Sequence, residues 1–559
     1  MTPMDRARSL RWLADETFDL LVIGGGITGA GVAREASLRG FKVALVEQAD
    51  FASGTSSRST KLIHGGLRYL NRLELKLVAE AVRERQLLLK MAPHLVEATP
   101  FLFPVYRGDP ETLLALRAGL AIYDVFARLQ APVPHRILNA PAVLQREPQV
   151  RWDGLVGGAV YTDSRTDDGR LTLAVLQSAH NAGTTLANYV AAEAFLHARD
   201  GQVMGAHVTD TVSGNQLEVR ATRVLCAAGP WADELRRMDE PGTRPVLRLT
   251  QGVHLSVPSH RLALSHAVVM RSHDAERRTM FAIPHGSYTY LGTTDTDYVG
   301  RPEAACVQEG DVAYILAAAN GTFPGAQLTE TDIASTWVGL RPLVRPRRRT
   351  SPSAVSRDYQ LFRNPSGLVS VGGGKLTAFR AMADHIVNEL MPGSRSAHSR
   401  GASLAALPGA DGQQPTAEEW NRLARATGAA PAQLREWCGS YGSHQGEVAA
   451  QLPAKLSGDA GLDWHRAMTR YAVKCEMAQR LEDVYRRRTG LQLFSRDNGC
   501  GWLEPLADEM ASLLGWSAER RRDEISRTRT AIDRMFTFRV DSLTPEEPAY
   551  VSERGGIYQ

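Results

Sequence analysis

Apolar and polar positions at the start of the chain follow the pattern of a parallel sheet. The segment FDLLVIG (18–24) is a continuous apolar run with the length of a buried strand, and FKVALVEQ (41–48) is a second run of the same kind. Between them, the glycine turn GGGITG leads into GVAREASLRG (31–40), which has the composition of a helix. Strand, glycine turn, helix and strand in this order predict the opening of a dinucleotide-binding fold.

Two later segments repeat the order of apolar strand, glycine and helix. They are TRVLCAAGPWADELRR (222–237) and GLVSVGGGKLTAFRAMADHIVNEL (367–390). Stretches between them, such as HAVVMRS and MFAIPHGSYTYLGTTD, alternate between apolar and polar residues, which is typical of antiparallel strands. We therefore expect a nucleotide-binding domain that is interrupted by a second domain inserted in pieces.

The last third of the chain has a different character. From about residue 400 a connector rich in Gly, Pro, Ala and Gln is followed by segments with helical periodicity and no strand signal. The fold class predicted is α/β, with a Rossmann-like domain interrupted by an α+β substrate domain that contains an antiparallel sheet, and a C-terminal all-helical domain. The expected boundaries are 18–70, 165–240 and 355–395 for the first, 71–164 and 241–354 for the second, and 396–559 for the third.

Composition excludes several classes of protein. Hydrophobic residues make up 43% and charged residues 23% of 559, and the net charge is only +4, which argues against nucleic acid as the main partner. The five cysteines are scattered without a CxxC pair, and no histidine cluster has zinc spacing. We expect reduced thiols, no metal site and a cytoplasmic protein, because the N-terminal segment lacks the apolar core of a signal peptide.

No segment has the uninterrupted apolar length of a membrane-spanning helix. The strongest candidate, ETLLALRAGLAIYDVFARL (111–129), is broken by Arg117, Asp124 and Arg128, which indicates an amphipathic helix. Packing on the protein's own core is the favoured interpretation, and contact with a membrane surface is the alternative.

The first glycine turn has the spacing of a nucleotide site. Gly24 permits the tight turn, Gly26 lets the backbone approach a pyrophosphate, and Gly29 lets the helix pack closely on the strand. The pyrophosphate would lie at the helix N-terminus. Glu47, at the end of the second strand, is placed to bind the ribose hydroxyls of an adenosine, and its charge argues against a 2′-phosphate.

The late glycine segment favours FAD over NAD. A second glycine turn at a helix start can present N–H groups to an isoalloxazine ring on which negative charge develops, whereas NAD dehydrogenases have no need of such a returning element. Another turn of the same sheet, with no ligand, is the alternative. On the first interpretation the interrupted Rossmann-like domain binds FAD.

The segment SGTSSRSTKLIHGGLRYL (53–70) fits neither helical nor strand periodicity. Its hydroxyls can donate to the phosphate and ribityl oxygens of a cofactor without adding charge, although loop solubility would account for some of them. The candidate cofactor-binding hydroxyls in it are those of Thr55, Ser56, Ser57, Ser59 and Thr60.

Several motifs in one order identify a resemblance to a known family. The motifs are GGGITGAG, Glu47, TSSRSTKLIHGGLRYL, RTDDGRL, AAGPWAD, LGTTDTDY, GLRPL, GGGKLTAFR and, in the C-terminal part, RYAVKCEMAQRLEDVYRRRTGL. Together they resemble the FAD-dependent glycerol-3-phosphate dehydrogenases. The resemblance implies oxidation of sn-glycerol 3-phosphate to dihydroxyacetone phosphate, with electrons passing through FAD to a membrane quinone. It also implies an enzyme attached peripherally to the inner face of the cell membrane, for which a homodimer is one option.

The resemblance assigns site residues as well. Arg68, Arg341 and Lys375 match positions at the substrate and flavin site. Cations suit a substrate that is nearly a dianion, because a charge-assisted hydrogen bond contributes about 1.5–3 kcal/mol. Ala378 stands where the family often has a second threonine. Further cofactor contacts are expected from Gly229, Gly374, Lys375 and Thr377, the last of which could instead cap its helix.

Oxidation of an alcohol also needs a base for the hydroxyl proton. His64, between Ile63 and Gly65, is the leading candidate because histidine titrates near neutral pH, and His254 is the second. Either histidine could instead be a structural group.

Two questions remain open at this level. The arginine-rich loop within RPLVRPRRRT (341–350) could contact anionic lipid, or could simply be solvated. The alternatives to a quinone-linked dehydrogenase are an oxidase that reduces oxygen to hydrogen peroxide, an amino-acid oxidase-like enzyme, and a non-catalytic flavin-binding protein.

Overall fold

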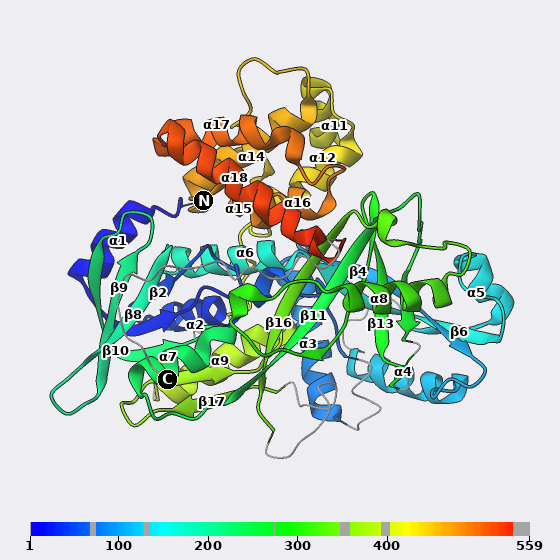
Figure 1. Ribbon diagram of the computed structural model, residues 1–559, viewed down its shortest axis with the longest axis horizontal. Helices are drawn as coiled ribbons and strands as arrows, with labels where there is room; N and C mark the ends of the chain where they lie inside the picture. The colour runs from blue at the N-terminus through cyan, green and yellow to red at the C-terminus, as the bar shows by residue number, and fades with distance from the viewer. Residues whose placement is uncertain are drawn as a thin grey trace.

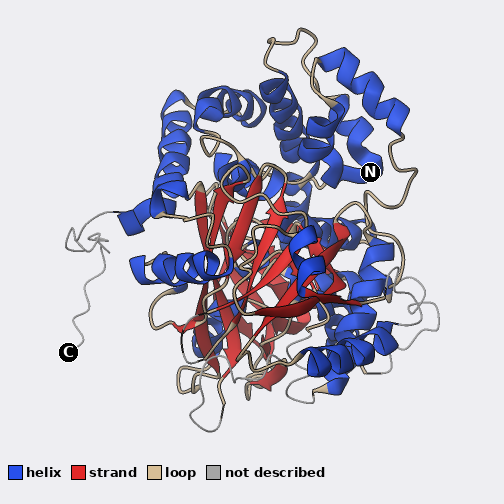
Figure 2. Ribbon diagram, turned by 90° about the vertical axis from the view of Figure 1, so that its right-hand side faces the viewer, coloured by secondary structure: helices blue, strands red, loops and turns tan. Residues whose placement is uncertain are grey.

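The computed structural model describes residues 2–66, 74–127, 134–272, 274, 276–346, 358–392 and 403–539. Two sheets lie side by side, and a group of helices from the C-terminal part of the chain covers one end of both (Figures 1 and 2). The α/β class, the interrupted Rossmann-like sheet and the helical C-terminal domain are confirmed.

The first sheet contains eight strands, with the order β17-β18-β10-β1-β2-β7 and with β8 and β9 at one side. Its centre is parallel, because β1 pairs in parallel with both β10 and β2. The strands are β1 (Thr17–Ile23), β2 (Val43–Glu47), β7 (Thr185–Asn188), β8 (Val190–His197), β9 (Val203–Asp210), β10 (Gln216–Cys226), β17 (Gln360–Arg363) and β18 (Val369–Gly372).

Helices cover this sheet because its strands are apolar on both faces. One cluster of buried apolar residues lies between one face of the sheet and three helices, of which the middle one packs on both others. A second apolar cluster fills the opposite face of the sheet. The helices are α2 (Ile27–Leu38), α6 (Asp168–Asn181) and α9 (Phe379–Leu390) on the first face, with α1 (Arg6–Asp15) and α7 (Ala232–Asp239) elsewhere on the sheet.

The second sheet contains ten strands and is mainly antiparallel, as the alternating segments predicted. Its strands are β3 (Leu62–Ile63), β4 (Val96–Tyr106), β5 (Arg136–Asn139), β6 (Leu155–Thr166), β11 (Leu247–Pro258), β12 (Ala267–Arg271), β13 (Thr279–His285), β14 (Tyr288–Gly292), β15 (Thr296–Asp297) and β16 (Ser335–Val344). Its helices are α3 (Leu75–Met91), α4 (Leu113–Ala127), α5 (Ala140–Arg146) and α8 (Glu309–Thr322).

The polar segment after β2 passes from one sheet to the other. It leaves the first sheet at Glu47 and pairs with β6 of the second sheet at Leu62 and Ile63. The domain boundaries given above stay predictions, but this pairing places residues 62–63 with the second sheet.

The C-terminal helices have their own apolar clusters. No strand occurs between residues 403 and 539, which agrees with the helical pattern. The helices are α11 (Ala417–Thr427), α12 (Pro431–Cys438), α13 (Gln445–Ala449), α14 (Ala460–Cys475), α15 (Leu481–Asp483), α16 (Leu491–Phe494), α17 (Leu503–Leu514) and α18 (Ala518–Asp533), with a π-helical turn η9 (Val484–Arg488).

In the part of the chain that the structure describes, no helix is long and apolar enough to cross a membrane, and the acidic, histidine and cysteine side chains form no group suited to a metal ion. All five cysteines are unpaired.

The contact between α2 and β1 depends on a glycine. A Cβ atom at Gly29 would lie 1.9 Å from the carbonyl oxygen of Gly24, so only glycine lets the helix approach the turn this closely. We expect Gly29→Ala to lower the free energy of unfolding by about 1–3 kcal/mol through overpacking, measured by chemical denaturation. Gly310→Ala is the control, because nothing lies within 4 Å of its Cβ position in α8. Equal stability of the two variants would contradict the prediction.

Candidate functional site

The first cavity lies at the carboxyl ends of β1 and β2. Gly24 and Gly26 line it together with the first turn of α2, which has no side-chain cap at Gly26 and no acidic residue. Gly24 has a φ of +115°, and a Cβ there would lie 2.6 Å from the carbonyl oxygen of Ala227. The backbone can therefore turn sharply here and leave an anion-binding helix end facing the cavity.

Glu47 closes one side of this cavity. Its carboxylate accepts hydrogen bonds from the backbone N–H of Gly25 at 2.7 Å and of Ala49 at 3.0 Å. Burial raises the pKa of Glu47, and the two backbone hydrogen bonds partly oppose that rise. The side chain lines the cavity at the place where an adenosine ribose was expected, and that contact stays a prediction.

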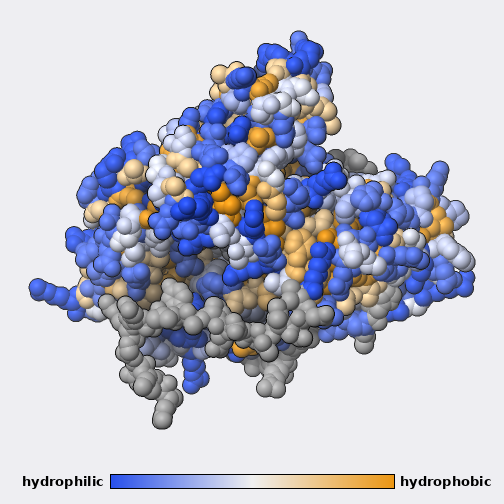
Figure 3. Space-filling view, turned by 45° about the horizontal axis from the view of Figure 1, so that its top comes forward, coloured by the Kyte–Doolittle hydropathy of each residue, from blue (hydrophilic) through white to orange (hydrophobic). Residues whose placement is uncertain are grey.

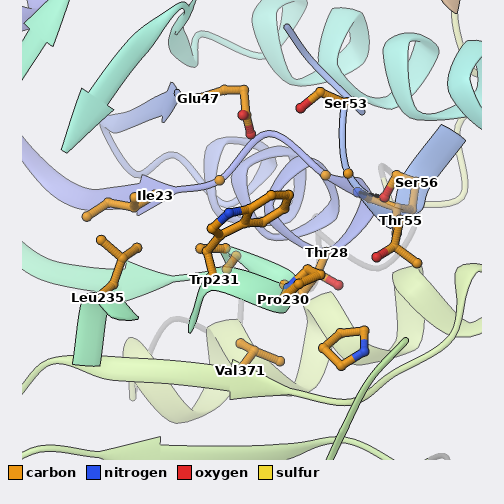
Figure 4. Close-up of a pocket in the computed structure, with 18 of the residues that line it drawn as sticks. Ile23, Thr28, Glu47, Ser53, Thr55, Ser56, Pro230, Trp231, Leu235 and Val371 are labelled. Atoms are coloured by element: carbon orange, nitrogen blue, oxygen red, sulfur yellow. Dashed lines mark hydrogen bonds between the residues drawn. The ribbon is translucent and has the colours of Figure 1, made fainter. Parts of the chain in front are cut away.

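The remaining wall comes from segments that are far apart in the sequence (Figure 4). Ser53 to Ser56 form one side, the turn at Gly229 and Trp231 another, and the late glycine turn the third. Of the residues expected to bind the cofactor, the structure brings together around this cavity Gly24, Gly26, Glu47, Thr55, Ser56, Ser59, Gly229, Gly374 and Lys375.

Several of the expected hydroxyls also have partners in the protein. Ser56 accepts a hydrogen bond from Ile27 N–H at 2.9 Å, and Thr55 donates to the carbonyl oxygen of Leu340 at 2.6 Å. Ser57 is buried away from the cavity, and Thr377 accepts from the backbone N–H of His64 at 3.3 Å. These hydroxyls shape the loop, so their role as ligand contacts stays a prediction.

A tryptophan that the sequence did not single out stands in the middle of this cavity wall. Trp231 lies against Gly54, where a Cβ would be 3.1 Å from its ring, and its indole N–H donates to Glu303 of the second domain. Figure 4 shows the ring in front of the first glycine turn. The motif AAGPWAD contained the signal, but nothing in it indicated that the indole lines a cavity.

The second cavity lies in the inserted domain, next to the first. Thr60, His64 and Arg341 line it, so the structure brings the leading base candidate and one predicted cation together. Pro342, the neighbour of Arg341 on β16, lines the first cavity. The loop before β3 and the strand β16 therefore separate the two cavities and contribute to both.

Arg341 shares a buried carboxylate with a second arginine. Its Nη1 lies 3.0 Å from Oδ1 of Asp295, and Nη2 of Arg278 lies 3.3 Å from the other oxygen. The Asp295 side chain is fully buried, and Arg278 also lines the cavity. Two cations on one carboxylate leave one net positive charge, which suits an anionic ligand. Arg278 was not among the predicted residues, because nothing near it in the sequence distinguishes it from a surface arginine.

His64 is held through its neighbours. The N–H of Gly65 donates to Asp163, a buried carboxylate that also accepts from Tyr123 and pairs with Arg85. A Cβ at Gly65 would lie 2.3 Å from the Tyr123 hydroxyl. The turn that carries His64 therefore has a fixed backbone position at the edge of the cavity.

His254 occupies a different environment. It is buried, lies outside both cavity walls, stacks on Trp337 with ring centroids 4.8 Å apart, and contacts Thr60 through Nε2 at 2.9 Å. Burial lowers the pKa of His254 well below its usual value, and the charges of Arg341 and Lys61 lower it further. The identity of the base stays a prediction, and this geometry favours His64.

Two basic features cannot be placed. Arg68 and residues 347–350 of the arginine-rich loop lie outside the described residues. Arg345, at the start of that loop, is exposed and donates to the carbonyl oxygen of Leu247 at 3.1 Å.

Comparison with known proteins agrees with this architecture. The model of the family described as FAD dependent oxidoreductase matches residues 19–386, and that described as the C-terminal domain of alpha-glycerophosphate oxidase matches residues 403–521. An aerobic glycerol-3-phosphate dehydrogenase of Staphylococcus saprophyticus is 35% identical, with 96% of this chain and 98% of that protein covered. An alpha-glycerophosphate oxidase of Streptococcus pneumoniae is 33% identical, with 92% and 95% covered.

A solved structure is similar over the same length. The glycerol-3-phosphate dehydrogenase from Bacillus halodurans complexed with FAD superposes with a TM-score of 0.79 and 31% identity. The match covers 96% of this chain and 99% of that one.

Proposed function

This chain belongs to the FAD dependent oxidoreductases, in the group of the glycerol-3-phosphate dehydrogenases and oxidases, and from this premise we propose that it oxidises sn-glycerol 3-phosphate to dihydroxyacetone phosphate and passes the electrons to a membrane quinone. The observation that carries the proposal is the second cavity, where His64 meets the pair Arg341 and Arg278 beside the cofactor cavity. A base and a net positive charge at one site are what a phosphorylated alcohol requires.

The residues around the first cavity suit FAD. The glycine turn at Gly24 excludes a Cβ, and the N-terminus of α2, where Ser56 accepts from the N–H of Ile27, offers further N–H groups to a pyrophosphate. Glu47 would bind the adenosine ribose, and Gly374 and Lys375 would lie toward the isoalloxazine ring. When bound, FAD supplies the acceptor for the hydride that leaves C2 of the substrate.

The protein's own groups perform the rest of the reaction. Arg341 and Arg278 bind the phosphate, and Asp295 keeps both guanidinium groups in place before the substrate arrives. His64 takes the proton of the C2 hydroxyl as the carbonyl forms. The Gly65 hydrogen bond to Asp163 fixes the backbone beside that imidazole.

The membrane part of the proposal rests on α4. Along its outer side Leu114, Ile122 and Val125 are 77%, 42% and 56% exposed, and they fall on one stripe of the helix. The inner side packs as expected, with Leu116 and Leu120 buried. The helix α4 lies on the periphery, away from the C-terminal helices (Figure 1), and the side of it opposite this exposed apolar row lines the substrate cavity. A bilayer surface that carries a quinone is the partner we propose for it.

The face seen in Figure 3 is largely hydrophilic, with apolar side chains in small, scattered groups. Such singly exposed apolar residues are normal for a protein surface.

The base assignment predicts a slow reductive half-reaction in one variant. Anaerobic glycerol 3-phosphate should bleach the flavin absorbance of the wild-type holoenzyme, and His64→Gln should slow this bleaching by about 10²–10⁴-fold while FAD stays bound. His254→Gln is the control and should change the rate far less, because its ring lines neither cavity. Bleaching of His64→Gln at the wild-type rate would disprove the assignment of the base. If glycerol 3-phosphate does not bleach the flavin of the wild-type enzyme, the proposed function is wrong.

The electron acceptor is tested by product analysis. With a soluble quinone we expect turnover to exceed that with oxygen, and hydrogen peroxide to fall well short of the dihydroxyacetone phosphate formed. The oxidase is the second candidate, because the Streptococcus pneumoniae relative of nearly equal similarity carries that name. Hydrogen peroxide formed in equal amount to dihydroxyacetone phosphate, with no increase in turnover when quinone is added, would favour the oxidase.

The membrane contact is tested with vesicles. Replacing Leu114, Ile122 and Val125 together by serine should weaken co-sedimentation with phosphatidylglycerol-containing vesicles by about tenfold or more, because three apolar side chains no longer leave water. Val299→Ser is the control, since this residue is 98% exposed but lies outside α4. Unchanged co-sedimentation of the triple variant would rule out α4 as the contact.

A further inference from the structure

The C-terminal helical domain meets the FAD-binding sheet through buried charges. Asp50, just after β2, is fully buried, and its carboxylate contacts Nε of Arg487 at 2.5 Å and Nη1 of Arg488 at 2.7 Å. Burial alone would raise the pKa of Asp50, but the charges of Arg488 and Arg487 outweigh it and hold the pKa at about 2. The pair of arginines and the carboxylate therefore remain ionised inside the protein.

The two arginines come from the π-helical turn η9. Consecutive side chains of an α-helix point about 100° apart, and the wider π turn reduces that divergence, so neighbouring residues can reach one carboxylate. The turn is closed by the hydrogen bond from Thr489 N–H to the carbonyl oxygen of Val484 at 3.0 Å. Turns of this kind occur frequently at functional sites.

Asp50 starts the loop that forms one wall of the cofactor cavity. Phe51 lies under the first glycine turn, and Ala52 N–H donates to the carbonyl oxygen of Gly25 at 3.1 Å. Ala52 has a φ of +60°, in the left-handed region that an alanine rarely adopts. The next residues, Ser53 to Ser56, line the cavity. A strained loop whose regular structure is limited to the short 3₁₀ turn Thr55–Ser57 needs an anchor, and Asp50 provides it.

The same helical domain holds the wall on the other side. Ser335 and Thr336, at the start of β16, donate to the carbonyl oxygens of Leu493 and Met535. Further along, β16 carries Pro342 at the first cavity and Arg341 at the second. The domain therefore contacts both structures that separate the cavities.

Stability alone does not explain the buried charges. Replacing a buried ion pair with apolar residues of similar size is often neutral or stabilising, so such a pair is weak support for a purely stabilising role. A carboxylate held by two guanidinium groups does, however, fix one backbone geometry.

We propose that the C-terminal helical domain acts as a clamp on the cofactor loop, in which Arg487 and Arg488 are positioning residues that hold Asp50 and so retain FAD. The proposal assigns a role to the helical domain, of which no described residue lines either cavity. It goes beyond the proposed reaction, because cofactor retention is measurable without any substrate.

The test is the rate at which diluted holoenzyme releases FAD, followed by the rise in free flavin fluorescence well below the unfolding temperature. Asp50→Asn keeps the side-chain volume and should speed release by about tenfold, which corresponds to about 1.4 kcal/mol. Arg470→Gln is the control. It breaks an ion pair within the helical domain, with Glu509 at 2.6 Å, in which neither Asp50 nor Arg487 nor Arg488 takes part. Its release rate should stay within about twofold of wild type.

A double variant separates positioning from stability. Asp50→Asn with Arg488→Met removes one charge of each sign and leaves Arg487 paired with Asp483 and Glu476 paired with Arg170, so the melting temperature should recover toward that of wild type. FAD release should stay fast, because the loop still lacks its anchor. Recovery of FAD retention together with the melting temperature, or equal release from Asp50→Asn and Arg470→Gln, would overturn the proposal. If Asp50→Asn does not fold, the double variant alone distinguishes the two outcomes.

Discussion

One loop must serve two cavities, and the rest of the structure is arranged around this constraint. The chain leaves the first sheet at Glu47 and reaches the second sheet at Leu62, and on the way it forms the wall between the two cavities. Such a segment has few hydrogen bonds of its own, so its backbone and side-chain groups must find partners in other elements. Asp50 finds them in the helical domain, and Ser59 and Lys61 find theirs in Asp168 of α6.

The anchoring groups are charged and buried, which has a chemical reason. A buried carboxylate between fixed donors has one favourable position, whereas an apolar contact tolerates sliding. Lys61 lies 2.6 Å from Asp168, whose other oxygen accepts from the N–H and hydroxyl of Ser59. Because His64 follows on the same segment, the positions of the hydroxyls at the first cavity and of His64 at the second are set by one set of contacts.

The second cavity uses the same principle. Asp295 is fully buried between Arg278 and Arg341, so two guanidinium groups are held in place at the cavity wall. Preorganised charge of this kind costs no rearrangement when an anion arrives. The exposed apolar row on α4 lies across the same helix from this cavity.

The sequence by itself determined the elements with strong local signals. The turn from Gly24 to Gly29, the buried strands on either side, the alternating strands of the second sheet and the helical C-terminal part all follow from spacing that neighbouring residues fix, and the family follows from long motifs in one order. Tertiary structure alone decided which distant groups meet. Arg278 reaches Asp295 across neighbouring segments of the second sheet, Trp231 meets Gly54, and Arg487 reaches Asp50 from the far end of the chain. The tertiary structure also distinguishes His64, which lines a cavity, from His254, which is buried and stacks on Trp337, because burial and stacking depend on residues remote in sequence. Periodicity reports which face of an element is buried, but not which other element covers it.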